Sequence, residues 1–280
     1  MDETEAYSVL LSRAERKTGT IPSQILVRHI LSITRGGGWP VQREAMEALL
    51  RRHAFGRRDD LKITARPPRG AIYGLYRTSR GRSSDRPYRT LFESLDPLRG
   101  SCDCPDFVRS SLGCCKHLLA VVEAWTGKPR KLKDALRIQG LCGPGEGPRL
   151  QWDSVRPLLG SGDWLERVRW TGVDAGKGSD GARSVPGWKW FRRGDGADLE
   201  IVDAHAARPA RRLEMVKDLA AVLERTGRAR GWTRLPPDPA LAALLRLEVE
   251  RLESVLGDSI SPRAAAEAMR SLKLELYTYQ

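Results

Sequence analysis

The 280-residue chain lacks any long apolar run and any recognisable N-terminal signal peptide. A membrane-spanning helix needs about 18 or more consecutive apolar residues, and no stretch approaches that length. We therefore expect no membrane partner and a cytoplasmic location. In such a reducing interior, cysteines bind metals or stay as free thiols more readily than they form disulfides.

Groups suited to catalysis are also scarce. The chain has four histidines, and His29, His53 and His205 are isolated in the sequence, so we interpret each as a core or surface residue. Residues 172–177 resemble a phosphate-binding loop, but the spacing is wrong and Gly178 stands where Ser or Thr would hold magnesium. We find no DEAH-like box and no acidic triad of the kind a transposase needs. The sequence predicts that this chain is not an enzyme.

Acidic residues are outnumbered, with 35 Asp or Glu against 48 Lys or Arg, a net charge of +13 and a pI of 9.9. Such an excess favours a partner that carries phosphates. The alternative explanation of the excess is an Arg-rich composition inherited from a GC-rich genome. Between Asp60 and Asp85 there is no acid at all. The cations of this segment are the predicted nucleic-acid-binding residues: Lys62, Arg66, Arg69, Arg77, Arg80 and Arg82.

Three tyrosines, Tyr73, Tyr76 and Tyr88, are interspersed with these cations. Basic side chains with nearby aromatic rings suit a phosphate backbone and, where strands separate, exposed bases. The alternative is a solvated Arg-rich loop at residues 79–89.

Four potential metal ligands are concentrated in one short stretch: Cys102, Cys104, Cys115 and His117. Three thiolates and one imidazole form a set that a closed, tetrahedral structural zinc prefers. In an extended segment Cys102 and Cys104 would share a face, and Pro105 would then turn the chain. The second pair can converge if Cys115 caps a helix and His117 lies in its first turn. The sequence predicts one structural Zn²⁺.

Two other cysteines bear on this site. Cys114 is the alternative ligand to Cys115, and the spacing favours Cys115. We expect Cys142 to be a free thiol.

The sequence Cys-Asp-Cys-Pro-Asp-Phe at 102–107 and the Cys-Lys-His that begins at Cys115 resemble a SWIM zinc finger, with ten residues between Cys104 and Cys115. The resemblance covers roughly residues 71–126 and implies a strand–turn–helix unit with the pattern CxCx(n)CxH. The family occurs in bacterial Swi/Snf-type helicase-like ATPases, Mutator-like transposases and signalling proteins. It implies DNA binding or protein–protein contact, so a protein-docking adaptor is the alternative to a DNA-binding region.

The last residues, Leu276–Gln280, resemble the Leu-x-x-Tyr-Gln segment that leads into a Swi/Snf-type ATPase core, where the glutamine contacts adenine. The run from Leu274 is half-apolar and strand-like, and it ends without a cap. We therefore expect the reading frame to continue past Gln280 into an ATPase motor, which would be a partner of this region together with nucleic acid, above all DNA.

The overall pattern predicts an α+β fold in which a small zinc-bound unit sits on a β-meander flanked by helical segments. The predicted divisions are a helical segment at 1–60, the meander with the zinc finger at 61–127, a linker at 128–150, a small mixed α/β segment at 151–235, and a helical segment at 236–280 that leads into the ATPase domain. The predicted strands are 61–65, 71–78, 88–94, 164–170, 188–191 and 199–202, and the predicted helices are 4–17, 23–34, 40–50, 117–125, 213–223, 241–256 and 262–272.

Overall fold

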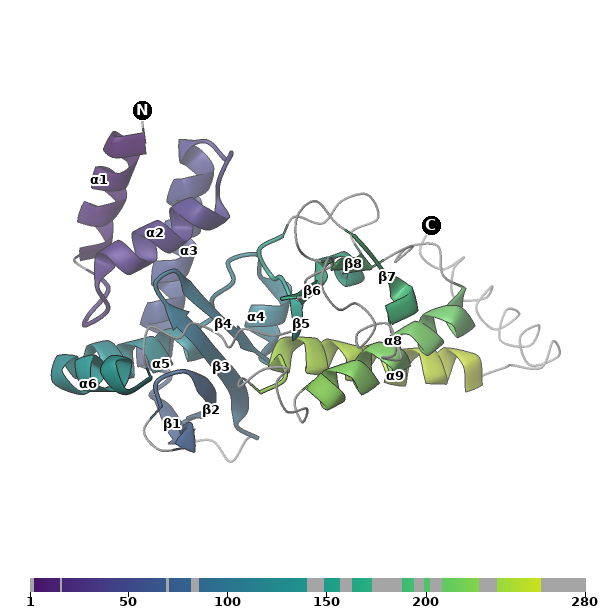
Figure 1. Cartoon of the computed structure of the whole chain (residues 1–280). Helices are drawn as coiled ribbons and strands as arrows, with labels where there is room; N and C mark the ends of the chain where they lie inside the picture. Colours follow the sequence, from purple (N-terminus) through teal and green to yellow (C-terminus); the bar gives the residue numbers. More distant parts are fainter. Residues whose placement is uncertain are drawn as a thin grey trace, which may run out of the picture.

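The computed structural model of the chain describes residues 3–15, 17–68, 71–81, 86–139, 149–156, 163–172, 188–193, 199–201, 208–226 and 236–257. These residues form two antiparallel four-stranded sheets with helices packed against them, which confirms the predicted α+β class (Figure 1). Within these ranges, no helix combines the length and apolar composition that a membrane crossing requires.

Three helices form the N-terminal part, as predicted: α1 (Glu3–Glu15), α2 (Ser23–Ile33) and α3 (Trp39–Arg58). They pack through side chains that are fully buried: Leu10, Leu26, Ile30, Met46 and Leu49. Gly36 separates α2 from α3 with a φ of 83°, a left-handed backbone that glycine adopts without steric cost. Pro40 lies in the first turn of α3, where its missing N–H has no helical partner to lose.

The first sheet is a meander in the order β1-β2-β3-β4. Its strands are β1 (Leu61–Ala65), β2 (Gly74–Arg80), β3 (Tyr88–Leu95) and β4 (Leu98–Cys102). The sequence predicted three strands and missed β4, which is short, contains Gly100 and follows β3 after a tight turn. Strand β4 matters for the site because it ends on Cys102.

Three helices follow the meander: α4 (Pro105–Arg109), α5 (Lys116–Thr126) and α6 (Pro129–Gln139). Helix α5 covers one face of the meander with its apolar stripe, which includes Leu118, Val121 and Val122. Helix α6 lies in the segment predicted as a linker. Leu132, Ala135 and Leu136 follow the helical spacing i, i+3 and i+4 and pack toward α5, a signal that the Lys-, Arg-, Gly- and Pro-rich composition of the segment obscured.

The second sheet has the order β5-β6-β8-β7. Its strands are β5 (Arg149–Trp152), β6 (Val168–Thr171), β7 (Phe191–Arg193) and β8 (Leu199–Ile201). The strand predicted over 164–170 is wrong in its first half, where Trp164–Arg167 form a 3-10 helix. Asp163 begins this turn, because its Oδ1 accepts a hydrogen bond from Leu165 N at 2.9 Å. Trp188–Trp190, predicted as strand, is also a 3-10 turn.

Two long helices, α8 (Pro209–Thr226) and α9 (Pro239–Gly257), pack against each other and against β5. On α9, Leu241, Leu245 and Leu252 are buried in the core, whereas Leu256 near the end of the helix is exposed. The helix predicted at 262–272, the run 274–280, His205 and Cys142 lie outside the described residues.

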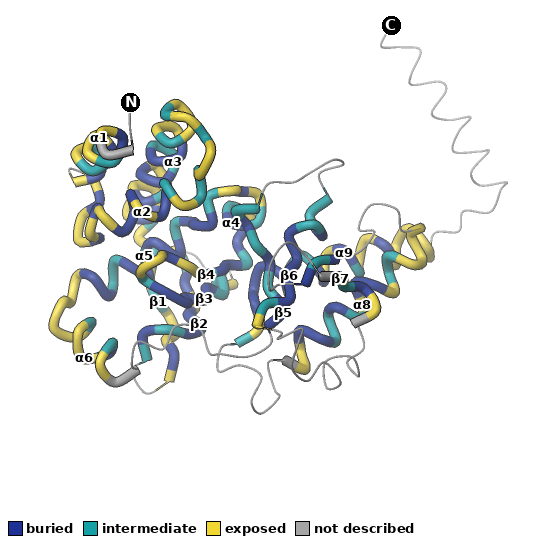
Figure 2. Tube along the Cα trace, turned by 45° about the horizontal axis from the view of Figure 1, so that its top comes forward, coloured by how far each residue is buried: buried dark blue, intermediate teal, exposed yellow. Residues whose placement is uncertain are grey.

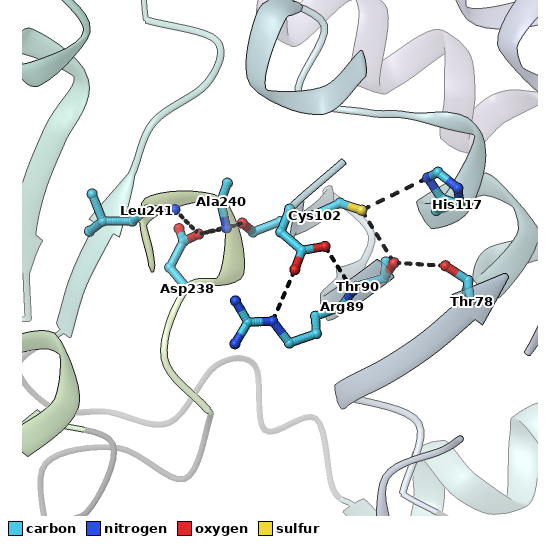
Figure 3. A network of polar contacts seen from close by, with 10 residues as sticks. Thr78, Arg89, Thr90, Cys102, His117, Asp238, Ala240 and Leu241 are labelled. Atoms are coloured by element: carbon cyan, nitrogen blue, oxygen red, sulfur yellow. Dashed lines mark hydrogen bonds and ion pairs between the residues drawn. The ribbon is translucent and has the colours of Figure 1, made fainter. Parts of the chain in front are cut away.

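The buried core runs from the N-terminal helices through the meander to the second sheet and α9 (Figure 2). Asp238 connects these parts, because its carboxylate accepts hydrogen bonds from Ser101 on β4 and from Trp152 N on β5, the latter at 3.0 Å. The same carboxylate caps α9 through Ala240 N at 2.9 Å and Leu241 N at 3.0 Å (Figure 3). Arg149 on β5 forms a second buried link through an ion pair with Glu93 on β3.

Candidate metal centre

The four predicted metal ligands converge. The ligand atoms of Cys102, Cys104, Cys115 and His117 all lie within 4.8 Å of one another, and all four residues are buried. His117 Nδ1 lies 3.9 Å from the Sγ atoms of both Cys102 and Cys115. Ligands at about 2.3 Å from a tetrahedral zinc would be about 3.5–3.8 Å apart, so these side chains need only a small contraction.

Each ligand is placed by the end of a secondary-structure element. Cys102 ends β4, and Cys104 is the N-cap of α4, where its Sγ accepts from Phe107 N at 3.4 Å. Cys115 is the N-cap of α5 and His117 lies in the first turn, as predicted. The backbone is extended both at Cys102, which ends β4, and at Cys104 (φ −75°, ψ 148°), as the sequence predicts, and the chain turns into α4 at Pro105.

The electrostatics of the cluster favour a cation. Burial raises the pKa of the Cys102 and Cys115 thiols well above the ordinary value. Hydrogen bonds from these two thiols lower the pKa of the Cys104 thiol. A divalent metal supplies the positive charge that would allow all three to bind as thiolates.

The donor set therefore fits one zinc ion, held by Cys102, Cys104, Cys115 and His117. Four protein ligands complete a tetrahedral site and leave no position for a reactive water. The chemistry that zinc would supply here is structural cross-linking of β4, α4 and α5.

Neighbouring side chains support the ligands. Thr90 Oγ1 lies 3.4 Å from Cys102 Sγ and 3.4 Å from Thr78 Oγ1, which places a polar pair behind the thiol (Figure 3). Arg89 holds the bend between Cys102 and Cys104, because its backbone N and Nε donate to Asp103 at 2.8 and 2.9 Å. These contacts orient the metal ligands from outside the cluster.

Cys114 is buried but is not part of the cluster, so the structure selects Cys115 over its neighbour. The Cys114 Sγ lies 3.9 Å from the Cys115 carbonyl oxygen, and burial raises the pKa of its thiol. His29 and His53 are core residues. Their ring nitrogens lie 2.7 Å from Leu112 O and 3.2 Å from Lys17 O respectively.

The predicted nucleic-acid-binding residues do not form one acid-free surface. Arg80 lies 3.6 Å from Asp59, and Lys62 lies 3.4 Å from Asp60, so two acids that precede the segment in sequence adjoin it in space. Arg66 and Arg77 are exposed. Arg69 and Arg82 lie outside the described residues.

Two of the three tyrosines are unavailable for base stacking. Tyr76 is fully buried between β2 and α5, where its hydroxyl oxygen accepts from Trp125 Nε1 at 2.7 Å. Burial raises the pKa of Tyr76 to about 12, although the hydrogen bond from Trp125 and, to a lesser extent, the Arg66 charge oppose this rise. The Tyr88 ring packs on His117, with ring centroids 4.7 Å apart, so it supports the metal centre.

Among known proteins, the SWIM zinc finger family matches residues 89–125, from β3 to the last turn of α5. This match contains all four ligands and covers far less than half of the chain. No curated protein and no solved structure matches the chain. The chain thus contains a SWIM zinc finger, a module used in nucleic-acid or protein interaction.

Proposed function

We propose that this chain is a non-enzymatic nucleic-acid-binding region, with DNA as the main target, in which zinc holds the fold and basic side chains contact phosphates. The observation that carries the proposal is the pair Arg66 and Arg77 on the meander beside the zinc finger. Both are exposed, and neither has an acidic partner within the described part of the chain. The excess of positive charge over the whole chain agrees with such a target.

Replacing Arg66 and Arg77 with Gln should weaken DNA binding to a similar degree for different sequences. Phosphate contacts release counterions, so the slope of log affinity against log salt should flatten by about 0.9 for each lost contact on a duplex. Fluorescence anisotropy over a salt series measures both effects. Arg43 and Arg225, exposed arginines on α3 and α8, provide a control pair with the same change of charge. An unchanged slope in the Arg66 and Arg77 variant would show that these two meander residues do not contact DNA phosphates.

The second candidate function is a protein-docking adaptor. It is favoured by exposed apolar side chains on α9, where Leu247 and Val255 are 55 % and 52 % exposed. Salt separates the two functions, because apolar docking depends little on ionic strength whereas phosphate binding falls steeply with it. A partner that binds equally well at low and high salt would favour the adaptor.

We also propose that this region serves a Swi/Snf-type ATPase motor encoded in the same reading frame, with DNA translocation as the activity of the whole protein. The support is the resemblance of Leu276–Gln280 to the segment that leads into such a motor. Sequencing the gene beyond codon 280 should show a loop with Gly-Lys-Ser or Gly-Lys-Thr, and later an acidic magnesium-binding box. A stop codon after Gln280 in an intact gene would overturn the proposed motor and leave nucleic-acid binding or protein docking by this chain alone.

A further inference from the structure

Helix α6 (Pro129–Gln139) carries a dense positive charge on its exposed side. Residues 128–137 contain five cations and one acid, Asp134. The cations, all exposed, are Lys128, Arg130, Lys131, Lys133 and Arg137. Within the described ranges, no side chain of the five has a hydrogen-bond or ion-pair partner. This differs from Arg80 and Lys62, whose charges are partly neutralised by Asp59 and Asp60.

The apolar side of α6 is already occupied. Leu132, Ala135 and Leu136 pack toward α5 and the core, and Ala135 is only 7 % exposed. A helix that binds a lipid surface needs a free apolar face to insert. Because this face is covered, α6 presents charge alone, and the partner it fits is a polyanion.

The spacing of the charges fits a regular row of phosphates. Arg130, Lys133 and Arg137 lie at i, i+3 and i+7, within about 60° of one another and about 100–160° around the helix from Leu132. The row is about 10 Å long, which corresponds to about three base-pair steps of a duplex. Residues 128–139 contain no aromatic ring on which an unpaired base could stack, so the helix suits a duplex better than a single strand.

The position of α6 connects it to the meander. Lys128 N, just before the helix, donates to Trp125 O at 3.0 Å, so α6 begins at the C-terminal end of α5. Trp125 also donates to Tyr76 on β2, and Arg66 directly follows Ala65, which pairs with Arg77 on the same strand. Arg66 and the α6 row thus belong to the same end of α5, opposite the metal centre. In Figure 1, α6 lies at the outer edge of the molecule, where a long partner has access.

We propose that α6 lies along the phosphate backbone of duplex nucleic acid, with Arg130, Lys133 and Arg137 as the contacting side chains. This inference rests on the proposed nucleic-acid-binding function. It adds which helix makes the contact and that the nucleic acid is double-stranded. Helix α5 joins the contact surface to the zinc cluster.

The test compares three forms of the full chain with a duplex DNA probe over a salt series. In the first variant, Arg130, Lys133 and Arg137 are changed to Gln. Losing three phosphate contacts should flatten the salt slope by about 2 to 3 units and weaken binding roughly tenfold or more at low salt. The matched control changes Arg43, Arg225 and Arg246 to Gln, which removes the same charge from exposed sites on α3, α8 and α9 and should leave the slope unchanged.

A charge-preserving variant, R130K/K133R/R137K, separates charge from structure. It should keep the parental salt slope, because counterion release depends on the charge and not on which cation carries it. If it loses as much binding as the Gln variant, or if the Gln variant binds like the parent, the inference is overturned. Tighter binding of a single strand than of a duplex would overturn it as well. If the parent itself binds neither probe, the proposed function has failed, and that result is distinct from the others.

Discussion

Replacing Cys102 with Ser, or His117 with Ala, should release zinc and unfold the region around β4, α4 and α5. The apparent binding free energy of zinc in small structural sites is about 10–16 kcal/mol at neutral pH. This is comparable to the whole stability of a domain, about 5–15 kcal/mol, so the fold of this part depends on the metal. Elemental analysis should find one zinc per parent chain and well under half an equivalent in the variants, together with a loss of cooperative thermal unfolding.

The matched control is Cys114→Ala, which removes a buried thiol next to a ligand without touching the cluster. It should keep one zinc per chain. Parent protein that is purified without chelators and contains less than about half an equivalent of zinc would contradict the site. Acid should also release the metal, because protons compete with zinc for the three thiolates.

Asp238→Ala should cause the second largest loss of stability. The Asp238 side chain is buried, with 2 % of the residue exposed, and it accepts from Ser101, Trp152 N, Ala240 N and Leu241 N. Each buried donor left without a partner costs about 1–3 kcal/mol, and losing a helix cap costs about 0.5–2 kcal/mol. We expect a destabilisation of about 3–5 kcal/mol, measured as a lower urea midpoint at unchanged zinc content.

Asp238→Asn provides a control that keeps the shape of the side chain. The amide oxygen can still cap α9, but the amide nitrogen cannot accept a hydrogen bond from Trp152 N. We therefore expect this variant to be destabilised by about 1–2 kcal/mol. If the Ala variant unfolds within about 0.5 kcal/mol of the parent, the link between the meander, the second sheet and α9 contributes little to stability.

The metal centre could be predicted because its determinants are local. Cys102 and Cys104 are two residues apart, as are Cys115 and His117, and the apolar stripe after His117 indicates where the helix begins. Helix α4 was harder to predict, because it has only five residues and little periodicity. The ligands and the extended backbone at Cys102 and Cys104 agree with the sequence prediction.

The basic surface could not be predicted in the same way. Asp59 Oδ2 accepts a hydrogen bond from Lys116 Nζ at 2.5 Å, although the two residues are 57 positions apart in the sequence. The same oxygen lies 3.6 Å from an Arg80 guanidinium nitrogen. The hydrogen bond from Lys116 is also the main reason that the pKa of the Asp59 carboxyl is lowered. A count of charges along the sequence cannot show which of them are paired across elements.

Composition and short-range spacing were enough to predict the zinc ligands, the α+β class, the three N-terminal helices and the excess of positive charge. Which charges are paired and which aromatic rings are exposed depends on how the elements pack against one another. Tyr76 is buried because α5 covers the face of β2 on which it lies. The α6 cations are exposed because Ala135 is buried and Leu132 partly buried toward α5. In both cases packing between elements, which local sequence does not specify, determines which side chains reach the solvent.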